Sequence, residues 1–383
     1  MQISFFEGSK RFKIDKPIRL IELFAGIGSQ AKALKNLGVN FEHYRICEFD
    51  KYAVQSYNAV HGTTFETSDI TKITANDLGI VDTDKYCYIM TYSFPCQDLS
   101  NAGLGKGMAK GSGTRSGLLW EVERLLDECK EMPQVLVMEN VPQVIGQGNI
   151  EHFAKWVEKL EQLGYKNKWQ VLNAKDFGIP QNRERCFMVS ILGDYYYDFP
   201  KTIPLKLRLK DMLEKEVDEK YYLSDRIVDY FTSHSKECEE KGNGFRFEPT
   251  DGNCVSKCIT TRAGGRMDDN YIIEKIPLFQ SGLIQPTDRE YKKNNNKRTE
   301  CIEWKNDNTS HALRTGVIPV VGLNANRFRI RKLTPKECWR LMGFDDTDVD
   351  KAIAVGMSNA QLYKQAGNSI VVNVLMAMFS QMI

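Results

Sequence analysis

Cys96 has the setting of a nucleophile. It lies between Pro95 and Gln97, after the apolar stretch Tyr86 to Met90 and before a glycine-rich stretch that runs from Asn101 to Gly117. A free thiol is only a few per cent ionised at neutral pH, so its surroundings or its substrate must help it to react. Because a cysteine taken alone is more often a buried bystander, other residues have to decide between these two interpretations.

Three charged side chains further along could act together with such a thiol. Glu139 follows the apolar run Val135 to Met138, and Arg183 and Arg185 alternate in an extended segment, which places both on one face. A carboxyl group can assist proton transfer, and guanidinium groups can stabilise an oxygen that gains negative charge. Taken alone, the pair Glu139-Asn140 is more often a turn, and the arginine pair is more often part of a solvated edge strand.

A glycine-rich turn precedes the first helical pattern. Residues 24–31 read Phe-Ala-Gly-Ile-Gly-Ser-Gln-Ala and fit the pattern Gly-x-Gly-x-x-Gly/Ala, and Glu48 ends the next apolar run. The glycines allow close approach of the backbone, and the carboxylate can accept hydrogen bonds from a ribose. This indicates an adenosine-containing cofactor, either a dinucleotide or S-adenosylmethionine, unless the turn holds no ligand. Asp69, at the end of an expected third strand, could bind an adenine amino group or simply cap a helix.

The elements that must position these residues alternate between strand and helix. We expect strands at Ile18–Phe24, Phe41–Glu48, Tyr86–Met90, Val135–Glu139, Trp169–Asn173 and Cys186–Ile191. We expect helices at Ser29–Leu37, Ala53–Val60, Leu118–Cys129, Glu151–Leu163 and Ser369–Met382. The alternation predicts an α/β fold with a doubly wound, mostly parallel sheet, whose ligands bind beyond the carboxyl ends of the strands.

The pattern changes after Pro200. Leu205 to Tyr230 is a charged connector that we expect to be helical, and the stretch from residue 233 to 326 is rich in Gly, Asn, Lys and Thr. Helical spacing resumes at Leu333 to Met342, where Thr334 fits the N-cap. The middle of the chain therefore reads as a separate, loop-rich module.

Two domains are expected within the 383 residues. Residues 1–200 would form a catalytic and cofactor-binding domain, which the C-terminal segment 345–383 would complete. Residues 201–344 would form a smaller recognition domain with connector helices.

The amino-acid composition excludes few classes of protein. Apolar residues make up 42% and charged residues 27% of the chain, which is ordinary for a globular protein, and the formal net charge of +2 does not indicate a nucleic-acid partner. The start of the chain does not resemble a secretory signal, and no stretch reaches the roughly 20 apolar residues that cross a bilayer. The ten cysteines read as reduced thiols. We expect a cytoplasmic protein with no membrane partner.

One further group of residues has the types that can bind a metal. His234 and Cys238 form one pair with three residues between them, and Cys254 and Cys258 form another. Such spacing occurs in zinc sites. The first pair continues an expected helix and no other ligand supports it, so we expect no metal.

Taken together and in this order, the motifs resemble those of the DNA cytosine-5 methyltransferase family, of the bacterial or phage type. They extend over nearly the whole chain, and the stretch between Arg185 and Arg331 falls where that family has its variable target-recognition region. The motifs are Phe24-Ala25-Gly26-Ile27-Gly28, Glu48, Asp69, Pro95-Cys96-Gln97, Glu139-Asn140-Val141, Gln181 to Arg185, Arg331 to Phe344 and Gln365 to Ser369. The resemblance implies the Rossmann-like fold of S-adenosylmethionine-dependent methyltransferases.

The resemblance also implies a reaction. Cys96 would attack carbon 6 of a cytosine, which makes carbon 5 nucleophilic enough to take the methyl group of S-adenosylmethionine and leaves S-adenosylhomocysteine. Glu139 would hydrogen-bond ring nitrogen 3. Arg185 would bind the carbonyl oxygen of the base, and Arg183 would support the same site. No side chain is indicated as the base that removes the carbon 5 proton.

The cofactor contacts follow from the same resemblance. Phe24 and Gly26 to Gly28 would hold the methionine end, Glu48 the ribose, Phe49 the adenine ring and Asp69 the adenine amino group. Further cofactor contacts are expected at Ala25, Ile27, Ile70, Pro95, Asn368 and Ser369.

Double-stranded DNA is the expected partner, with the target cytosine flipped out of the helix. The stretch Asn101 to Gly117 would close over the DNA, unless it is an ordinary surface loop. The expected DNA contacts are Gln97, Ser100 and Arg115, together with Thr260, Thr261 and Arg262 in the recognition region. Ala312 to Arg314 is the other candidate for the recognition motif.

Three alternatives differ in class. A tRNA cytosine-5 methyltransferase would share these motifs, although Gln97 after the cysteine favours DNA. A non-catalytic DNA-binding protein on the same fold would have lost one of the reacting residues, and all are present. A nicotinamide dehydrogenase leaves Cys96 and Glu139 unexplained.

We expect a monomer, associated with the nucleoid through DNA, that acts separately from any cognate restriction endonuclease.

Overall fold

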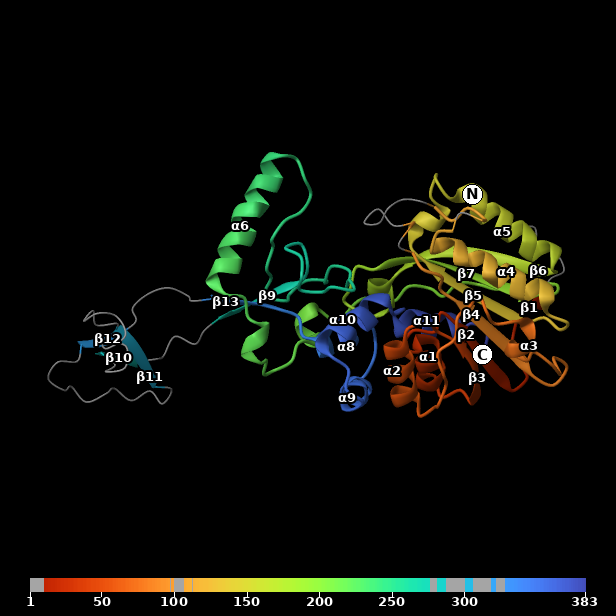
Figure 1. Cartoon of the computed structure of the whole chain (residues 1–383), viewed down its shortest axis with the longest axis horizontal. Coiled ribbons are helices and arrows are strands. Elements are labelled where there is room, and N and C mark those ends of the chain that lie inside the picture. Colours follow the sequence, from red (N-terminus) through yellow and green to blue (C-terminus); the bar gives the residue numbers. More distant parts are fainter. Residues whose placement is uncertain are drawn as a thin grey trace.

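A six-stranded sheet forms the core of the larger part of the molecule, on the right in Figure 1. The computed structural model describes residues 10–96, 98–99, 107–111, 113–275, 281–286, 300–305, 318–321 and 328–383. The strand order is β3-β2-β4-β5-β7-β6, and β7 alone in this sheet runs antiparallel to its neighbours. The strands are β2 (Ile18–Leu23), β3 (Phe41–Cys47), β4 (Cys87–Tyr92), β5 (Val135–Asn140), β6 (Tyr165–Asn173) and β7 (Glu184–Leu192). The predicted mostly parallel sheet is confirmed.

Helices cover both faces of this sheet, as a doubly wound fold requires (Figure 1). Leu20 and Ile21 are neighbours on β2 whose side chains point to opposite faces. Leu20 packs into a core with Ala31 of one helix, whereas Ile21 packs into a second core with Trp156 of another. The helices are α1 (Ser29–Asn36), α2 (Lys51–His61) and α11 (Val372–Phe379) on the first side, and α3 (Ala75–Leu78), α4 (Leu119–Glu128) and α5 (Ile150–Gln162) on the second.

The central strands β4 and β5 are buried along their whole length. Their sequences are nearly continuous apolar runs, which is the pattern of parallel strands with helices on both faces. Because β4 and β5 run parallel, their carboxyl ends lie at the same edge of the sheet. Glu139 lies near the end of β5, and Cys96 follows the end of β4.

Three helices near the C-terminus pack against the sheet domain. They are α8 (Pro335–Arg340), α9 (Asp346–Ala354) and α10 (Asn359–Asn368). Thr334 caps α8 as predicted, because its hydroxyl accepts a hydrogen bond from the Glu337 backbone at 3.2 Å. Arg331 binds both carboxylate oxygens of Glu337, each at 2.9 Å, and Trp339 donates to the carbonyl of Leu362 at 3.0 Å. The motif around residues 331–344 thus builds a core shared with α10, and the domain boundary at residue 344 stays a prediction.

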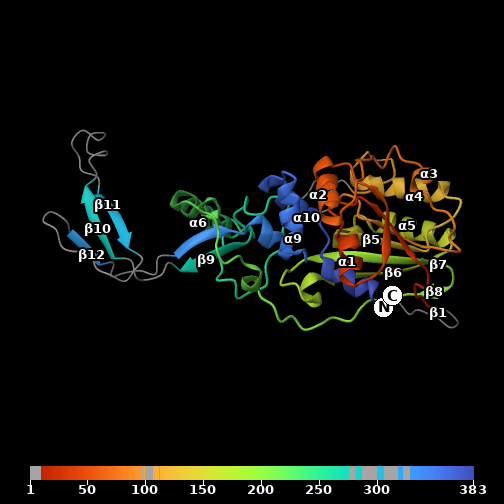
Figure 2. The same ribbon diagram turned by 90° about the horizontal axis from the view of Figure 1, so that it is seen from below.

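The middle of the chain lies on the far side of α8 and α10 from the sheet (Figures 1 and 2). It contains α6 (Asp225–Glu240) and the antiparallel pair β9 (Tyr271–Lys275) and β13 (Phe328–Lys332). Three further strands, β10 (Ser281–Pro286), β11 (Glu300–Lys305) and β12 (Ile318–Val321), form an antiparallel sheet, and β1 (Lys10–Arg11) pairs with β8 (Tyr195–Tyr196).

The connector at residues 205–230 differs from its prediction. Two short 3-10 turns, Leu209–Met212 and Glu219–Tyr221, precede α6, which begins only at Asp225. The backbone N–H groups of Leu209 and Lys210 donate to carbonyl groups of a loop at residues 252–254, both at 2.9 Å. These tertiary hydrogen bonds replace those that a continuous helix would need.

Two other local predictions were wrong. Residues 63–69 form no strand before Asp69, because the Asn58 side chain binds the backbone N–H and C=O of Phe65 at 2.9 and 2.8 Å. The last helix begins at Val372 rather than Ser369, whose carbonyl is bound by the Arg183 guanidinium at 2.8 Å. In both places a side chain from another part of the chain forms hydrogen bonds with backbone groups that the predicted strand or helix would have used.

Within the described ranges, no helix has both the length and the apolar character needed to cross a membrane.

Candidate active site

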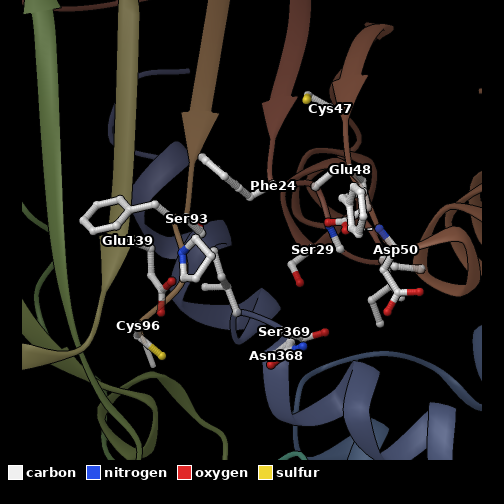
Figure 3. A pocket seen from close by; sticks show the side chains of 18 of the residues that line it. Phe24, Ser29, Cys47, Glu48, Asp50, Ser93, Cys96, Glu139, Asn368 and Ser369 are labelled. Carbon is white, nitrogen blue, oxygen red and sulfur yellow. Dashed lines mark hydrogen bonds between the residues drawn. The ribbon is translucent and has the colours of Figure 1, made fainter. Parts of the chain in front are cut away.

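A cavity of about 580 Å³ opens at the carboxyl ends of the parallel strands. Residues that are far apart in the sequence meet there, with Cys96 and Glu139 at one end and Glu48 and Asp50 at the other (Figure 3). The predicted residues that line it are Phe24, Ala25, Gly26, Ile27, Glu48, Phe49, Asp69, Ile70, Pro95, Cys96, Arg115, Glu139, Arg183, Arg185, Asn368 and Ser369. The expectation that these motifs converge beyond the strand ends is therefore met by the geometry.

Some predicted residues lie elsewhere. Gly28 is absent from the lining, because Tyr57 and His61 pack against it and a Cβ there would lie 2.3 Å from Nε2 of His61. Its φ of +78° shapes the turn that carries its neighbours. Thr260, Thr261 and Arg262 do not line the cavity either. The other predicted contacts Gln97 and Ser100, and the alternative recognition motif at residues 312–314, fall outside the described residues.

The glycine turn is held by a carboxylate. Oε2 of Glu48 accepts a hydrogen bond from the Gly26 N–H at 2.9 Å, and Oε1 accepts one from the Asp50 N–H at 2.8 Å. Burial raises the pKa of Glu48, with the hydrogen bonds from these N–H groups opposing the shift. Beside it, Phe49 is 79% exposed, which is unusual for so large an apolar side chain. This end of the cavity thus offers a shaped backbone, a fixed carboxylate and an open aromatic face.

The opposite end carries the groups that could do chemistry. The Nε of Arg185 lies 3.1 Å from Oε1 of Glu139. Burial raises the pKa of Glu139, although the charges of Arg185 and Arg183 oppose this. The pKa of the Cys96 thiol is also raised, first by burial and then by Glu139. A carboxyl group and a thiol whose pKa values are both raised by burial therefore line the same end of the cavity.

Arg183 has a different environment from Arg185. Its guanidinium donates to the carbonyl of Ile259 at 3.0 Å and to the carbonyls of Gly367 and Ser369 at 2.9 and 2.8 Å. The side chain is almost fully buried, and its Nη1 also contacts the sulfur of Cys258 at 3.2 Å. Arg183, which directly precedes β7, thus joins the loop at Ile259 to the end of α10.

Comparison with known proteins identifies the family. A family model described as C-5 cytosine-specific DNA methylase matches residues 18–383. The chain belongs to this family. It is similar to the type II methyltransferase M2.ScrFI of Lactococcus lactis subsp. cremoris, with 32% identity over 413 residues that cover 95% of this chain and 99% of the relative. It is also similar to the orphan methyltransferase M.SPBetaI of Bacillus phage SPbeta, with 30% identity covering 96% of this chain and 97% of the relative.

A solved structure supports the fold of this DNA cytosine methylase. The Dnmt2 methyltransferase of S. pombe matches 94% of the chain and 97% of its own length, with a TM-score of 0.63 and 20% sequence identity. The chain is therefore an enzyme that methylates cytosine at carbon 5, built on the S-adenosylmethionine-dependent methyltransferase fold.

The methylase anchors both ends of the stretch after Cys96 by contacts that sequence patterns did not indicate. The Ser116 hydroxyl donates to the Pro95 carbonyl at 2.6 Å, and the Asp98 carboxylate accepts from the Arg115 N–H at 2.8 Å. Asn140 donates to the Phe94 carbonyl at 2.9 Å, which fixes the residues before Cys96. The sequence motif thus included Asn140, but it did not indicate this hydrogen bond to the Phe94 carbonyl.

Several lining residues were missed. Lys364 of α10 and Asp50, the N-cap of α2, form an ion pair of 2.7 Å at the end of the cavity that contains Glu48. Nothing in the local pattern connects two residues so distant in the chain. The lining residues that belong to a named motif but were given no role are Ser29, Gln30, Asn140, Val141, Gln365 and Gly367. The other missed lining residues are Cys47, Ala53, Ser68, Thr71, Ser93, Phe94, Leu118 and Ile370.

The four candidate metal ligands make separate contacts as two pairs. The sulfur of Cys238 is 3.9 Å from Nε2 of His234, while the sulfur of Cys254 is 3.3 Å from the hydroxyl of Thr250. In the part of the methylase that the structure describes, no three His, Cys, Asp or Glu side chains are grouped as metal ligands.

Proposed function

We propose that this methylase transfers a methyl group from S-adenosylmethionine to carbon 5 of a flipped-out cytosine in a specific double-stranded DNA sequence, through a covalent bond between Cys96 and carbon 6. The observation that carries the proposal is the meeting of Cys96, Glu139 and Arg185 in one cavity with the glycine turn. A stacked base cannot reach such a cavity, so the cytosine must leave the helix.

Cys96, Glu139 and Arg185 would each have a different role in the reaction. Attack of the Cys96 thiolate on carbon 6 places negative charge on the ring, and carbon 5 becomes an enamine carbon that can accept a methyl group. Glu139, whose pKa burial raises, can share its proton with ring nitrogen 3 and offset that charge. Arg185 can bind the carbonyl oxygen of the base, since its guanidinium lines the cavity. Removal of the carbon 5 proton then expels the thiolate.

The cofactor end fits S-adenosylmethionine. The turn at Phe24 to Ile27 gives a backbone that a ligand can approach closely, and the Glu48 carboxylate, which lines the cavity beside this turn, could accept from ribose hydroxyls. The exposed ring of Phe49 offers a stacking face for adenine, and Asp69 an acceptor for its amino group. When bound, S-adenosylmethionine supplies the methyl group, and Asn368 and Ser369 close the pocket from α10 (Figure 3).

DNA would enter from the side that carries the recognition region. Arg115 lines the cavity, and we assign to Thr260, Thr261 and Arg262 a contact with the DNA beside it. We further propose that the chain acts as a cytoplasmic monomer and that any cognate restriction endonuclease is a separate protein. The names of the two relatives, one type II and one orphan, are compatible with either a paired or a solitary methylase.

Covalent trapping tests this proposal. DNA that carries 5-fluorocytosine should form a stable adduct with the wild-type chain, because fluorine cannot leave carbon 5 as a cation. We expect the Cys96→Ala chain to give no adduct and no methyl transfer while it still binds S-adenosylmethionine. Cys129→Ala is the matched control, since Cys129 is a half-buried thiol outside the cavity. Methyl transfer by Cys96→Ala, or equal transfer to tRNA and duplex DNA, would overturn the proposal.

A further inference from the structure

The glycine turn at the cofactor end of the cavity has an unusual backbone. Phe24, Gly26 and Gly28 have φ angles of +58°, +56° and +78°, all in the left-handed region. For Phe24 this conformation is strained, because a bulky side chain crowds its own backbone there. Such a turn keeps its shape only when its surroundings hold it in place. The hydrogen bond from the Gly26 N–H to Glu48 is one such support, from a residue that also lines the cavity.

His61, the last residue of α2, supports the same turn from another side. Its Nε2 lies 3.0 Å from the carbonyl oxygen of Ile27. A carbonyl oxygen can only accept, so Nε2 must carry the proton and donate it. Ile27 lines the cavity, whereas His61 does not. His61 therefore holds the turn without touching a ligand that occupies the cavity.

The ring of His61 is fixed by its neighbours. Its centroid lies 4.6 Å from that of Tyr57 and 5.3 Å from that of His43. Tyr57 is itself held, since its hydroxyl donates to the buried carboxylate of Glu22 at 2.5 Å and lies 3.0 Å from Nδ1 of His43. A Cβ at residue 28 would lie 2.3 Å from Nε2 of His61, so the glycine at this position leaves room for the ring.

The His61 ring is neutral. Burial lowers its pKa to about 3, and the charges of His43, Lys35 and Lys32 act in the same direction. The hydrogen bond to the Ile27 carbonyl opposes this shift. In a neutral imidazole only one nitrogen carries a proton, and the Ile27 carbonyl selects Nε2. The donor is therefore present throughout the neutral pH range.

We propose that His61 is a positioning residue for the cofactor: the Nε2–H of its ring holds the Ile27 carbonyl and keeps the turn at residues 24–28 in the shape that binds S-adenosylmethionine. His61 acts through the turn and does not contact the cofactor. The inference rests on the proposed function, in which this turn binds S-adenosylmethionine. It gives a role to the end of α2, which none of the sequence motifs includes.

Substitutions of His61 separate its hydrogen bond from its ring. His61→Phe keeps a flat ring beside Tyr57 but cannot donate to the Ile27 carbonyl. We expect the Kd for S-adenosylmethionine, measured by calorimetric titration, to rise by about 3- to 10-fold, the usual net worth of one neutral hydrogen bond. His61→Gln restores an N–H donor and should recover part of the lost affinity. His152→Phe is the matched control, because His152 is a half-buried histidine of α5 outside the cavity.

A histidine that only fills space would give a different result. Its replacement would lower the free energy of unfolding without a selective effect on the cofactor. We expect instead that His61→Phe raises the KM for S-adenosylmethionine more than the KM for DNA, and that His61→Gln reduces this difference. An unchanged Kd for S-adenosylmethionine in folded His61→Phe, or an equal rise of both KM values, would overturn the inference.

Nitrogen NMR of wild type tests the hydrogen bond without relying on a variant that folds. Ring-nitrogen resonances distinguish the two neutral tautomers from the charged ring, and the chain has five histidines. One of them should stay neutral with its proton on Nε2 from about pH 5 to pH 8. The absence of such a histidine would overturn the inference.

The wild-type chain also separates this inference from the proposed function. Failure of wild type to bind S-adenosylmethionine would refute the proposed function. Equal binding by wild type and His61→Phe would refute the role of His61 alone.

Discussion

The Nε of Arg185 lies 3.1 Å from Oε1 of Glu139, so the two groups that we assign to neighbouring atoms of the base already satisfy each other in the free enzyme. A flipped cytosine offers an acceptor oxygen beside ring nitrogen 3, and it can enter this pair by sharing both partners. The ion pair therefore orients both groups before the substrate arrives, which reduces the reorganisation that the reaction requires.

Replacement of Glu139 by Gln tests this pair. Glutamine cannot share a proton with ring nitrogen 3, and it leaves Arg185 without its carboxylate. We expect kcat to fall by about 10²- to 10⁴-fold, the usual effect of losing acid–base assistance. Glu42→Gln is the control, because Glu42 is an exposed carboxylate on β3 that pairs with Arg19 of β2, outside the cavity. A Glu139→Gln rate close to wild type, measured with labelled methyl groups, would exclude the role.

The carboxylate of Glu48 supports a prediction about the cofactor. It holds the N–H groups of Gly26 and Asp50 in the free enzyme, so Glu48→Ala removes both the expected ribose contact and the fastening of the turn. We expect the Kd for S-adenosylmethionine to rise by about 10- to 100-fold, as for lost hydrogen bonds to a charged group. Calorimetric titration measures it. An unchanged Kd, with Glu42→Ala as the reference, would show that Glu48 does not contact the ligand.

The pattern of residues was enough to predict where the reacting groups meet, for a physical reason. Carboxyl ends of parallel strands lie at one edge of the sheet, so Cys96 after β4 and Glu139 at the end of β5 had to be neighbours. Strand and helix positions followed from periodicity, which depends on residues close in the sequence. The roles of these residues remain predictions, since geometry alone does not test them.

Contacts between distant loops could not be predicted in this way. Cys258 meets Arg183 across 75 positions of the sequence, and Lys364 meets Asp50 across 314. Neither pair lies in a repeating pattern, because each depends on how whole loops pack. The same cause explains the missing strand before Asp69, where the Asn58 side chain binds backbone groups that a strand would have paired.

Glu22 gives the fold a dependence on pH. It is fully buried on β2, accepts a hydrogen bond from the Tyr57 hydroxyl at 2.5 Å, and has its pKa raised by burial from 4.5 to about 7. Between these values the folded chain holds a proton that the unfolded chain releases, so the contribution of Glu22 to stability is largest below pH 4.5 and falls as pH rises toward 7. The free energy of unfolding of wild type relative to Glu22→Gln should fall by about 3 kcal/mol over this window. Denaturant titrations at several pH values measure it, and a difference independent of pH would contradict it.

Gly367 sets how closely the recognition loop approaches α10. A Cβ at this residue would lie 2.4 Å from the backbone nitrogen of Thr261 and 2.6 Å from the carbonyl oxygen of Thr260, and backbone atoms cannot turn aside. Gly367→Ala should therefore displace the loop and destabilise the fold by about 1–3 kcal/mol, as overpacking does. We expect the KM for DNA to rise more than the Kd for S-adenosylmethionine. Gly148→Ala is the matched control, because a Cβ there meets no atom within 4 Å. Equal effects of the two substitutions would mean that this contact does not position the loop.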